Sequence, residues 1–195
     1  MNTLSKKICF TALFTALTAL STWLITIPLP ASGYFNVGDV FVLLSAWCLG
    51  PLYGALAAGL GAATADLLSG FALYAPATLI TKAAVALTAY YTYALFKKLT
   101  KKATDKTRPL LTLPSAFLGE LLMVLCYLFF EAVVLSLGAG ALANVLGNCL
   151  QGICAAIAAP LVFYPLQQSK FLKELFPALS LKRIPAPIKH KKTPK

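Results

Sequence analysis

Six apolar segments follow one another along this chain, and most are close to the length that a bilayer requires. A helix needs about 20 apolar residues to cross the hydrocarbon core, or somewhat fewer where it is short or broken. The segments are predicted near residues 7–27, 38–50, 51–70, 76–96, 111–136 and 140–165. The expected fold class is therefore an all-α membrane protein in which six transmembrane helices form one bundle.

Composition agrees with a membrane protein. Hydrophobic residues make up 59% of the 195 residues and charged residues only 12%, whereas an average soluble domain has roughly 25% charged residues. Because the apolar segments occupy most of the chain, a soluble domain with one anchor is disfavoured, and we expect one transmembrane domain over residues 1–168. Residues 169–195 are basic and interrupted by prolines, which is typical of a partly disordered cytoplasmic tail.

Two local features bear on where the segments begin and end. Gly50 and Pro51 separate the second and third segments and favour a turn. The first segment follows Lys6 and Lys7, as the apolar region of a signal peptide would. That region has about 7 to 15 residues, whereas this segment is as long as a membrane span. We therefore expect it to be the first helix of the bundle.

Lysine and arginine fall on one side of the predicted bundle. Lys6 and Lys7 precede the first segment, further basic residues between Lys97 and Arg108 follow the fourth, and others follow residue 169. Positive charge beside spans stays in the cytoplasm, so six spans predict two cytoplasmic termini and a location in the cell membrane. Contact with anionic lipid heads explains the net charge of +11, and no motif predicts binding to nucleic acid.

Several kinds of chemistry are excluded by what the chain lacks. Its single histidine, His190, lies in the predicted tail, which excludes Ser-His-Asp, Cys-His and H-E-x-x-H sites within the membrane. The five cysteines form no C-x-x-C pair, so neither a metal site nor a disulfide framework is predicted. A G-x-x-x-x-G-K-[ST] motif is absent as well. We expect no catalytic residue and no cofactor, and powered transport would need ATP-binding partners.

Polar residues within the segments concentrate in the outer half of the predicted bundle. Lys82 lies roughly 9 Å inside the fourth segment, and Asn144, Asn148 and Gln151 share one face of the sixth. The other polar residues at this level are Asn36, Asp39, Asp66 and Glu131. Ionisable groups inside spans usually face the interior and mark functional cavities, so a pocket open to the outside is predicted. Only Glu120 lies in the inner half, so no polar route crosses the bundle.

The charged residues of this group also have structural explanations. Lys82 needs a partner, which Glu131, Asp66 or a bound anionic ligand could supply. With a carboxylate it could form a purely structural ion pair. Asp39 follows Gly38, so its side chain could cap the start of the second helix. A lysine in a pocket also hints at an anionic or carbonyl-bearing ligand, because an ammonium group donates to oxygen.

The uncharged residues have two explanations each. Tyr34, Phe35 and Tyr74 could belong to the aromatic belt at the membrane surface, or they could stack on a flat heterocycle in an apolar-walled pocket. Asn144 and Asn148 could hydrogen-bond a neighbouring helix instead of a ligand.

Small residues form two stripes that allow close approach of helices, since packing drives helix association in lipid. The stripes consist of Ala12, Ala16 and Ala19 on the first segment and of Gly54, Ala58 and Ala62 on the third. Both could serve internal packing, or one could be the docking surface for another membrane protein.

Residues 33–87 carry a family resemblance. They contain G-Y-F-N-x-G-D, L-G-P-x-Y-G-A-L-A, A-D-L-L-S-G and Y-A-P-A-T-x-x-x-K. In these motifs the chain resembles the substrate-binding S components of energy-coupling factor (ECF) vitamin transporters, and the similarity to the riboflavin-type group is close. The motifs cover the first four segments, whereas the fifth and sixth match mainly in hydropathy.

The resemblance implies a six-helix protein that captures a vitamin or vitamin precursor from outside, of the riboflavin, pyridoxine-like or thiamine-precursor class. The family's outer-leaflet pocket maps to Tyr34, Asn36, Tyr74, Lys82, Glu131, Asn144 and Asn148, beside which the residue analysis adds Asp39 and Asp66. The family's A-x-x-x-A docking pattern matches Ala12 and Ala16. The implied partners are one transmembrane T subunit and two ATP-binding A subunits, and the loaded S component topples in the bilayer to release its ligand.

Two other classes of function stay open at this point. A membrane scaffold would bind a partner through a small-residue stripe and would have no small-molecule ligand. An intramembrane enzyme would use Asp39 and Asp66 as a paired acid and base, although neither lies in a protease motif.

Overall fold

The computed structural model of the chain describes residues 3–30, 33–100 and 108–169. Six α-helices occur there: α1 Thr3–Leu24, α2 Asp39–Leu49, α3 Pro51–Leu68, α4 Ala75–Leu99, α5 Thr112–Phe129 and α6 Leu142–Gln168. The shorter elements are the strands β1 Thr26–Pro28 and β2 Tyr34–Asn36, the 3₁₀ turns η1 Arg108–Leu111 and η3 Gly138–Ala141, and the π-helical turn η2 Phe130–Val134. The predicted tail, apart from Ser169, lies outside the described residues.

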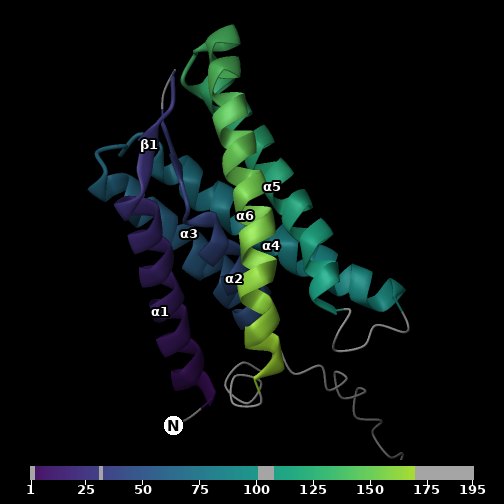
Figure 1. Cartoon of the computed structure of the whole chain (residues 1–195). Helices are drawn as coiled ribbons and strands as arrows, with labels where there is room; N and C mark the ends of the chain where they lie inside the picture. The colour runs from purple at the N-terminus through teal and green to yellow at the C-terminus, as the bar shows by residue number, and fades with distance from the viewer. Residues whose placement is uncertain (1–2, 31–32, 101–107, 170–195) are drawn as a thin grey trace, which may run out of the picture.

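The helices form an elongated bundle in which successive helices run in opposite directions (Figure 1). The start of α1, the start of α5 and the end of α6 lie at the same end of the molecule. The β1–β2 hairpin and the turn between α5 and α6 lie toward the other end. This arrangement brings the connections on each side of the bundle together.

The six predicted segments are found as six helices, and each predicted boundary lies within about four residues of the observed one when η2 is counted with α5. Four helical stretches of the described residues are long and apolar enough to cross a membrane: Leu4–Leu24, Ala75–Leu99, Thr112–Val134 and Gly138–Gln168. The α2 helix has 11 residues, so it rises only about 16 Å, and a core of about 30 Å is wider than that. The number of six spans therefore stays a prediction.

A sharp turn joins α2 to α3, as the sequence predicted. Gly50 ends α2 with φ of 83°, a conformation that favours glycine. Pro51 then begins α3, where the missing N–H of proline removes no helical hydrogen bond.

The short α2 helix lies in the centre of the bundle, against α1, α3, α4 and α6. Eight of its 11 residues are buried. Toward its C-terminal end, the Trp47 ring packs against Phe163 of α6, with ring centroids 5.1 Å apart. Because α2 is enclosed, the carboxyl group of Asp39 at its first residue lies inside the protein.

The small residues of α3 allow its neighbours to approach closely. A Cβ atom added to Gly61 would lie 2.6 Å from the carbonyl oxygen of Thr15 on α1. One added to Gly59 would lie 2.7 Å from the carbonyl oxygen of Leu79 on α4. The predicted stripe of Gly54, Ala58 and Ala62 is also buried inside the bundle. This stripe therefore serves internal packing.

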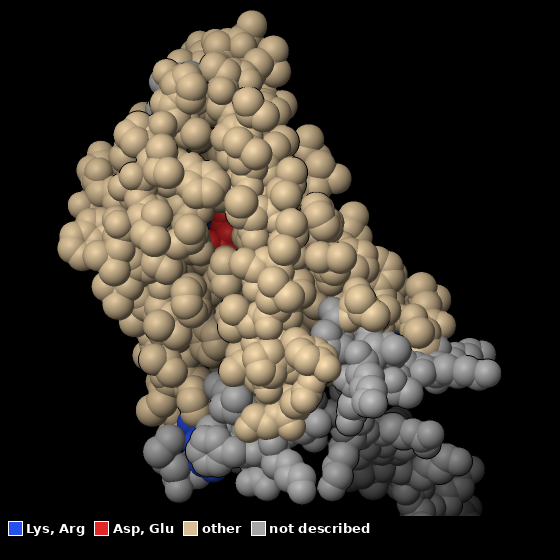
Figure 2. Space-filling view, in the orientation of Figure 1, with Lys and Arg blue, Asp and Glu red and all other residues tan. Residues whose placement is uncertain are grey.

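The outer surface of the bundle is apolar, as expected of a protein that faces lipid. Exposed leucine and isoleucine side chains cover α1, α4, α5 and α6. The face in Figure 2 is almost free of charge: lysine shows at the lower end, and one acidic patch is visible in a recess between the helices.

Two local features were not predicted. The first segment was expected to remain helical to residue 27, but α1 ends at Leu24 and the chain continues as β1. The β-branched residues before Pro28 and the proline itself favour extended backbone, which explains the change. The β1 and β2 strands pair antiparallel, with Ile27 opposite Phe35. The second feature is the η2 turn, which contains Glu131, and such π-helical turns occur frequently at functional sites.

The close contact at Gly61 gives a test of the packing. The substitution Gly61→Ala should lower the free energy of unfolding by about 1–3 kcal/mol, because the added methyl group overlaps the backbone of α1. Thermal unfolding in detergent would measure this loss. The matched control is Gly140→Ala, where the nearest atom, the Cβ of Leu137, lies 4.0 Å away. Equal melting temperatures for the two variants would contradict the packing described for α1 and α3.

Candidate substrate-binding site

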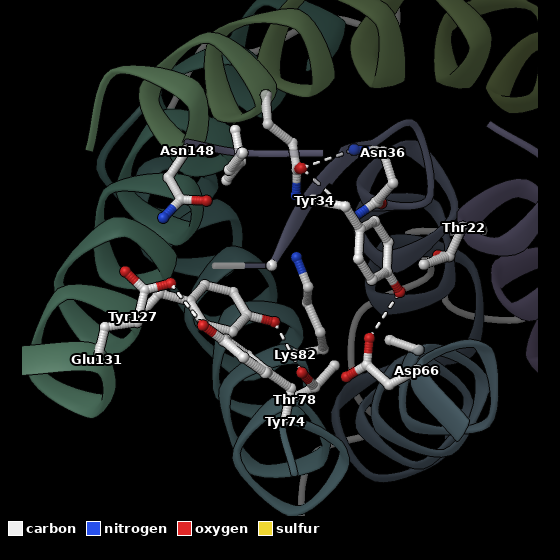
Figure 3. Close-up of a pocket in the computed structure, with 14 residues that line it drawn as sticks. Thr22, Tyr34, Asn36, Asp66, Tyr74, Thr78, Lys82, Tyr127, Glu131 and Asn148 are labelled. Atoms are coloured by element: carbon white, nitrogen blue, oxygen red, sulfur yellow. Dashed lines mark hydrogen bonds between the residues drawn. The ribbon is translucent and has the colours of Figure 1, made fainter. Parts of the chain in front are cut away.

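Polar side chains from α1, β2, α3, α4, α5, η2 and α6 surround one small cavity in the half of the bundle near the hairpin (Figure 3). The cavity is lined by Thr22, Leu29, Gly33, Tyr34, Asn36, Ala62, Asp66, Tyr74, Thr78, Lys82, Tyr127, Glu131, Asn148 and Gln151. Seven of the nine predicted binding residues are in this group. The other two, Asp39 and Asn144, are fully buried and do not line it.

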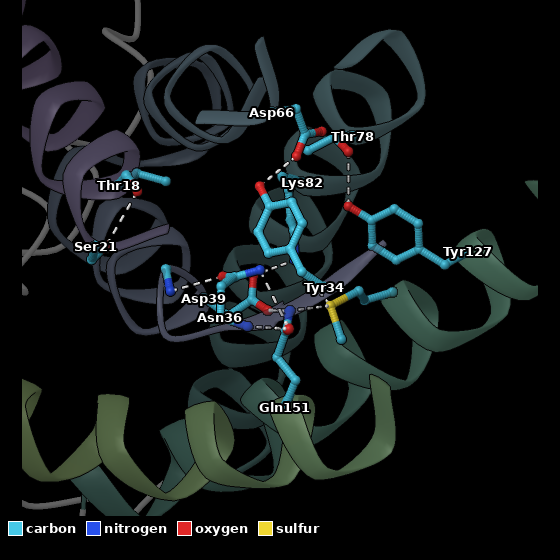
Figure 4. A network of polar contacts seen from close by, with 12 residues as sticks. Thr18, Ser21, Tyr34, Asn36, Asp39, Asp66, Thr78, Lys82, Tyr127 and Gln151 are labelled. Carbon is cyan, nitrogen blue, oxygen red and sulfur yellow. Dashed lines mark hydrogen bonds and ion pairs between the residues drawn. The ribbon is translucent and has the colours of Figure 1, made fainter. Parts of the chain in front are cut away.

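A buried ion pair lies beside the cavity (Figure 4). The Nζ atom of Lys82 is 2.5 Å from Oδ1 of Asp39 and 3.0 Å from the sulfur of Met123. The second carboxylate oxygen of Asp39 accepts a hydrogen bond of 2.6 Å from Nε2 of Gln151. The expectation that Glu131, Asp66 or a ligand balances the lysine was therefore wrong, because Asp39 does so.

The alternative role of Asp39 as a helix cap was also wrong. Gly38 occupies the capping position of α2, and no side chain caps this helix. Asp39 is the first residue of the helix, where a negative charge is favoured by the helix dipole. Its two oxygens are taken by Lys82 and Gln151, so it holds the site together from behind the cavity wall.

Gln151 connects this ion pair to the hairpin. Its Oε1 atom accepts hydrogen bonds from the backbone N–H of Asn36 at 2.8 Å and from the Asn36 side chain at 3.3 Å. The Oδ1 atom of Asn36 accepts from the N–H of Gly38 at 2.9 Å, which turns the chain into α2. The spacing of Gln151 from Asn144 and Asn148 signalled a shared helix face, but it did not reveal this link to the hairpin.

Two tyrosine–carboxylate pairs flank the cavity. The Tyr34 hydroxyl donates to Oδ1 of Asp66 at 2.6 Å, and the Tyr74 hydroxyl donates to Oε1 of Glu131 at 3.2 Å. Burial, and then the nearby charge of Asp66, raise the pKa of Tyr34. The phenol of Tyr34 therefore remains a hydrogen-bond donor at neutral pH. Asn144 also interacts with Glu131, which explains why it is buried behind the wall.

An aromatic wall accompanies these polar pairs. Phe71 packs between Tyr34 and Tyr74, with ring centroids 4.9 and 6.2 Å apart, and Phe130 packs 5.3 Å from Tyr74. The hydroxyl groups of Tyr127 and Thr78 are 3.0 Å apart at the cavity wall. Phe71, Thr78 and Tyr127 were not predicted, because one aromatic or threonine in an apolar segment carries no signal of its own.

The open space between these side chains is small. Its volume is about 30 Å³. Pockets for small organic ligands have volumes of about 300–1,000 Å³. A vitamin-sized molecule therefore fits only if the hairpin or the lining side chains move.

The arrangement suits binding by stacking and hydrogen bonds. Both oxygens of Asp39 are bonded to other side chains, so it is not free to act with Asp66 as a paired acid and base. Among the described residues, no group of three or more histidine, cysteine, aspartate or glutamate side chains could hold a metal ion.

The other predicted surface, Ala12, Ala16 and Ala19, lies on the outside of the bundle. These residues line a groove of about 500 Å³ between α1 and α3. The groove is also lined by Ile8, Thr11, Thr15, Tyr53, Leu56, Leu60 and Thr64. Because Ala12 and Ala16 are exposed, this stripe differs from the buried stripe on α3.

Comparison with known proteins identifies the kind of protein that this site belongs to. The sequence model of the family "ECF-type riboflavin transporter, S component" matches residues 2–168. The chain belongs to this family. The match includes α5 and α6, for which the motifs alone gave little support.

A relative in Pyrococcus woesei, described as an uncharacterized protein in a gap 3' region, is 34% identical over 139 residues. The alignment covers 71% of this chain and 86% of the relative.

Membership in the ECF S components confirms several predictions together. These proteins are membrane proteins and the substrate-binding subunits of vitamin transporters, and they are not enzymes. They bind small vitamin ligands and work with the partners of an ECF module. The hypothesis of an intramembrane enzyme is therefore excluded.

The buried ion pair gives a prediction for stability. In this S component, Lys82→Met or Asp39→Asn leaves one charged group buried without its partner, so each should lower the free energy of unfolding by about 3–5 kcal/mol. The double variant removes both charges, so its free energy of unfolding should fall by much less than the sum of the two single decreases. Unfolding of all four proteins in detergent would measure the coupling. Additive losses would show that the two residues do not depend on each other.

Proposed function

We propose that this S component captures a vitamin or vitamin precursor from outside the cell and delivers it by ATP-driven uptake. The candidates are riboflavin, a pyridoxine-like compound or a thiamine precursor. The observation that carries the proposal is the convergence of aromatic and buried polar side chains on one cavity within a membrane bundle. Together with the family, this arrangement supports recognition of a small, flat and polar molecule.

The direction of capture follows from charge and from the position of the site. The start of α1 and the end of α6 lie at one end of the bundle, and Lys6 and Lys7 are near that end of α1. Positive charge favours the cytoplasmic side, so both termini are assigned there and all six helices take part in a multi-pass bundle. Tyr74 precedes α4 and Glu131 follows α5, which supports a position of the cavity near the opposite, external side.

The ATP-driven step requires partners, because this chain contains no ATP-binding motif. The proposed partners are one transmembrane T subunit and two ATP-binding A subunits. The groove along Ala12 and Ala16 supports docking, since small exposed residues let a partner helix approach closely. The deep half of the bundle contains the enclosed α2 helix, so delivery is assigned to movement of the whole S component.

Mass spectrometry of small molecules that co-purify with the detergent-solubilised protein tests the proposal. A stoichiometric vitamin or vitamin precursor would support it and would identify the substrate. A protein that retains no small molecule and binds no flavin, pyridoxine or pyrimidine would instead favour a scaffold without a ligand.

The groove on α1 gives a prediction that separates binding from uptake. Ala12→Leu or Ala16→Leu should leave ligand affinity unchanged and abolish uptake in cells that also contain the T and A subunits, because leucine fills the groove. The matched control is Ala143→Leu, at an exposed position of α6 outside the groove, which should retain uptake. Loss of ligand binding in the α1 variants would show that the stripe supports the internal structure instead.

A further inference from the structure

Two carboxyl groups lie on opposite sides of the cavity, with Lys82 between them (Figure 3). Asp66 comes from α3 and Glu131 from η2. Their side chains are 4% and 2% exposed, so neither carboxyl group is solvated by bulk water. Lys82 is the third charged residue of the cavity wall. If its positive charge is neutralised by another partner, the two acidic groups determine the charge of the wall.

The charge of Lys82 is balanced by Asp39, which does not line the cavity. Its ammonium group is paired with Asp39 at 2.5 Å and also contacts the sulfur of Met123. Its Nζ atom lies 5.5 Å from the centre of the Tyr127 ring, within the range of a cation–π interaction. Lys82 therefore offers little unused positive charge to a ligand.

Each of the two acidic groups retains an unused acceptor atom. One oxygen of Asp66 and one of Glu131 accept from the hydroxyl groups of Tyr34 and Tyr74. The other oxygens, Oδ2 of Asp66 and Oε2 of Glu131, are buried and have no hydrogen-bond partner among the described residues. An unsatisfied carboxylate oxygen in a buried site costs several kcal/mol, so a ligand that donates to these atoms gains that energy.

We propose that the ligand is a flat heterocycle, uncharged or positively charged, that offers N–H or O–H donors to Asp66 and Glu131, and that the site rejects anions. This inference rests on the proposed function and narrows its substrate class. Amino groups, hydroxymethyl groups and protonated ring nitrogens have the required donors. A carboxylate or phosphate would meet two acidic groups and a lysine that already has its counter-ion.

The proposal reverses the expectation that follows from the sequence. A lysine inside a predicted pocket suggested an anionic or carbonyl-bearing ligand. In the structure the positive charge of Lys82 is paired with Asp39. Asp66 and Glu131 are left with oxygen atoms that can still accept hydrogen bonds. The rings of Tyr34 and Tyr74, which donate to these two acidic groups, also line the cavity, which suits a planar ligand with donors at its edges.

Matched ligand pairs test this charge preference on the intact protein. The first pair is pyridoxine and 4-pyridoxic acid, and the second is 4-amino-5-hydroxymethyl-2-methylpyrimidine and its 5-carboxylic acid. Each pair replaces one hydroxymethyl group by a carboxylate on the same ring. Riboflavin and its 5'-phosphate form a third pair. Titration calorimetry in detergent should show, in whichever pair binds, an affinity at least about tenfold higher for the member without the anionic group, which corresponds to 1.4 kcal/mol.

Variants of the acidic residues show whether they cause the preference. Asp66→Asn and Glu131→Gln keep the shape of the side chain and remove its charge. Each should weaken binding of the preferred ligand and reduce its advantage over the anionic member of the pair. The matched control is Glu120→Gln, because Glu120 is equally buried but does not line the cavity. Its selectivity should equal that of the unmodified protein, and thermal unfolding would confirm that each variant is folded.

The outcomes separate this inference from the function on which it rests. If an anionic member binds as tightly as its partner, or if a carboxylate or phosphate compound co-purifies with the protein, the inference is wrong while the capture function stands. Selectivity that persists in both Asp66→Asn and Glu131→Gln would also overturn it. If no pair binds and no small molecule co-purifies, the proposed capture function itself is contradicted.

Discussion

The buried ion pair between Lys82 and Asp39 is the interaction on which the site depends. Its two charges lie in a membrane protein, where neither is tolerated without a partner. Asp39 can reach Lys82 only because α2 is short and enclosed, which places its first residue at the depth of the lysine on α4. Gln151 then joins the same carboxylate to the β1–β2 hairpin. The ion pair and the hydrogen bonds of Gln151 therefore link α2, α4, α6 and the hairpin in one network.

The hairpin is held by side chains that also form the cavity wall. Asn36 is bonded to Gln151 on α6, and Tyr34 is bonded to Asp66 on α3. Since β1 is exposed along its whole length, the hairpin is held through β2, where the Tyr34 ring also packs on Phe71. The hydrogen bonds that shape the cavity thus also hold the hairpin against the bundle.

The sequence was informative wherever a local pattern determines the structure. Apolar length predicted all six helices, Gly50 and Pro51 predicted the turn, and depth along each segment together with the family resemblance predicted seven of the residues that line the cavity. The pairing of Lys82 could not be predicted, because the rotation and depth of an 11-residue helix depend on tertiary packing. Judged only by depth along their segments, Asp66 and Glu131 were better candidates than Asp39 for the partner of Lys82. The two alanine and glycine stripes looked alike in sequence, and only their packing shows that one is buried and the other exposed.

The small volume of the cavity has a kinetic consequence. A ligand much larger than about 30 Å³ enters only when the hairpin or the lining side chains move. Association is then limited by the fraction of molecules in that open form, and the observed dissociation constant is the intrinsic one divided by this fraction. Once the ligand is enclosed, escape requires the same opening, so residence time becomes long for the same reason that entry is slow. A binding protein built in this way retains its ligand through a slow exit.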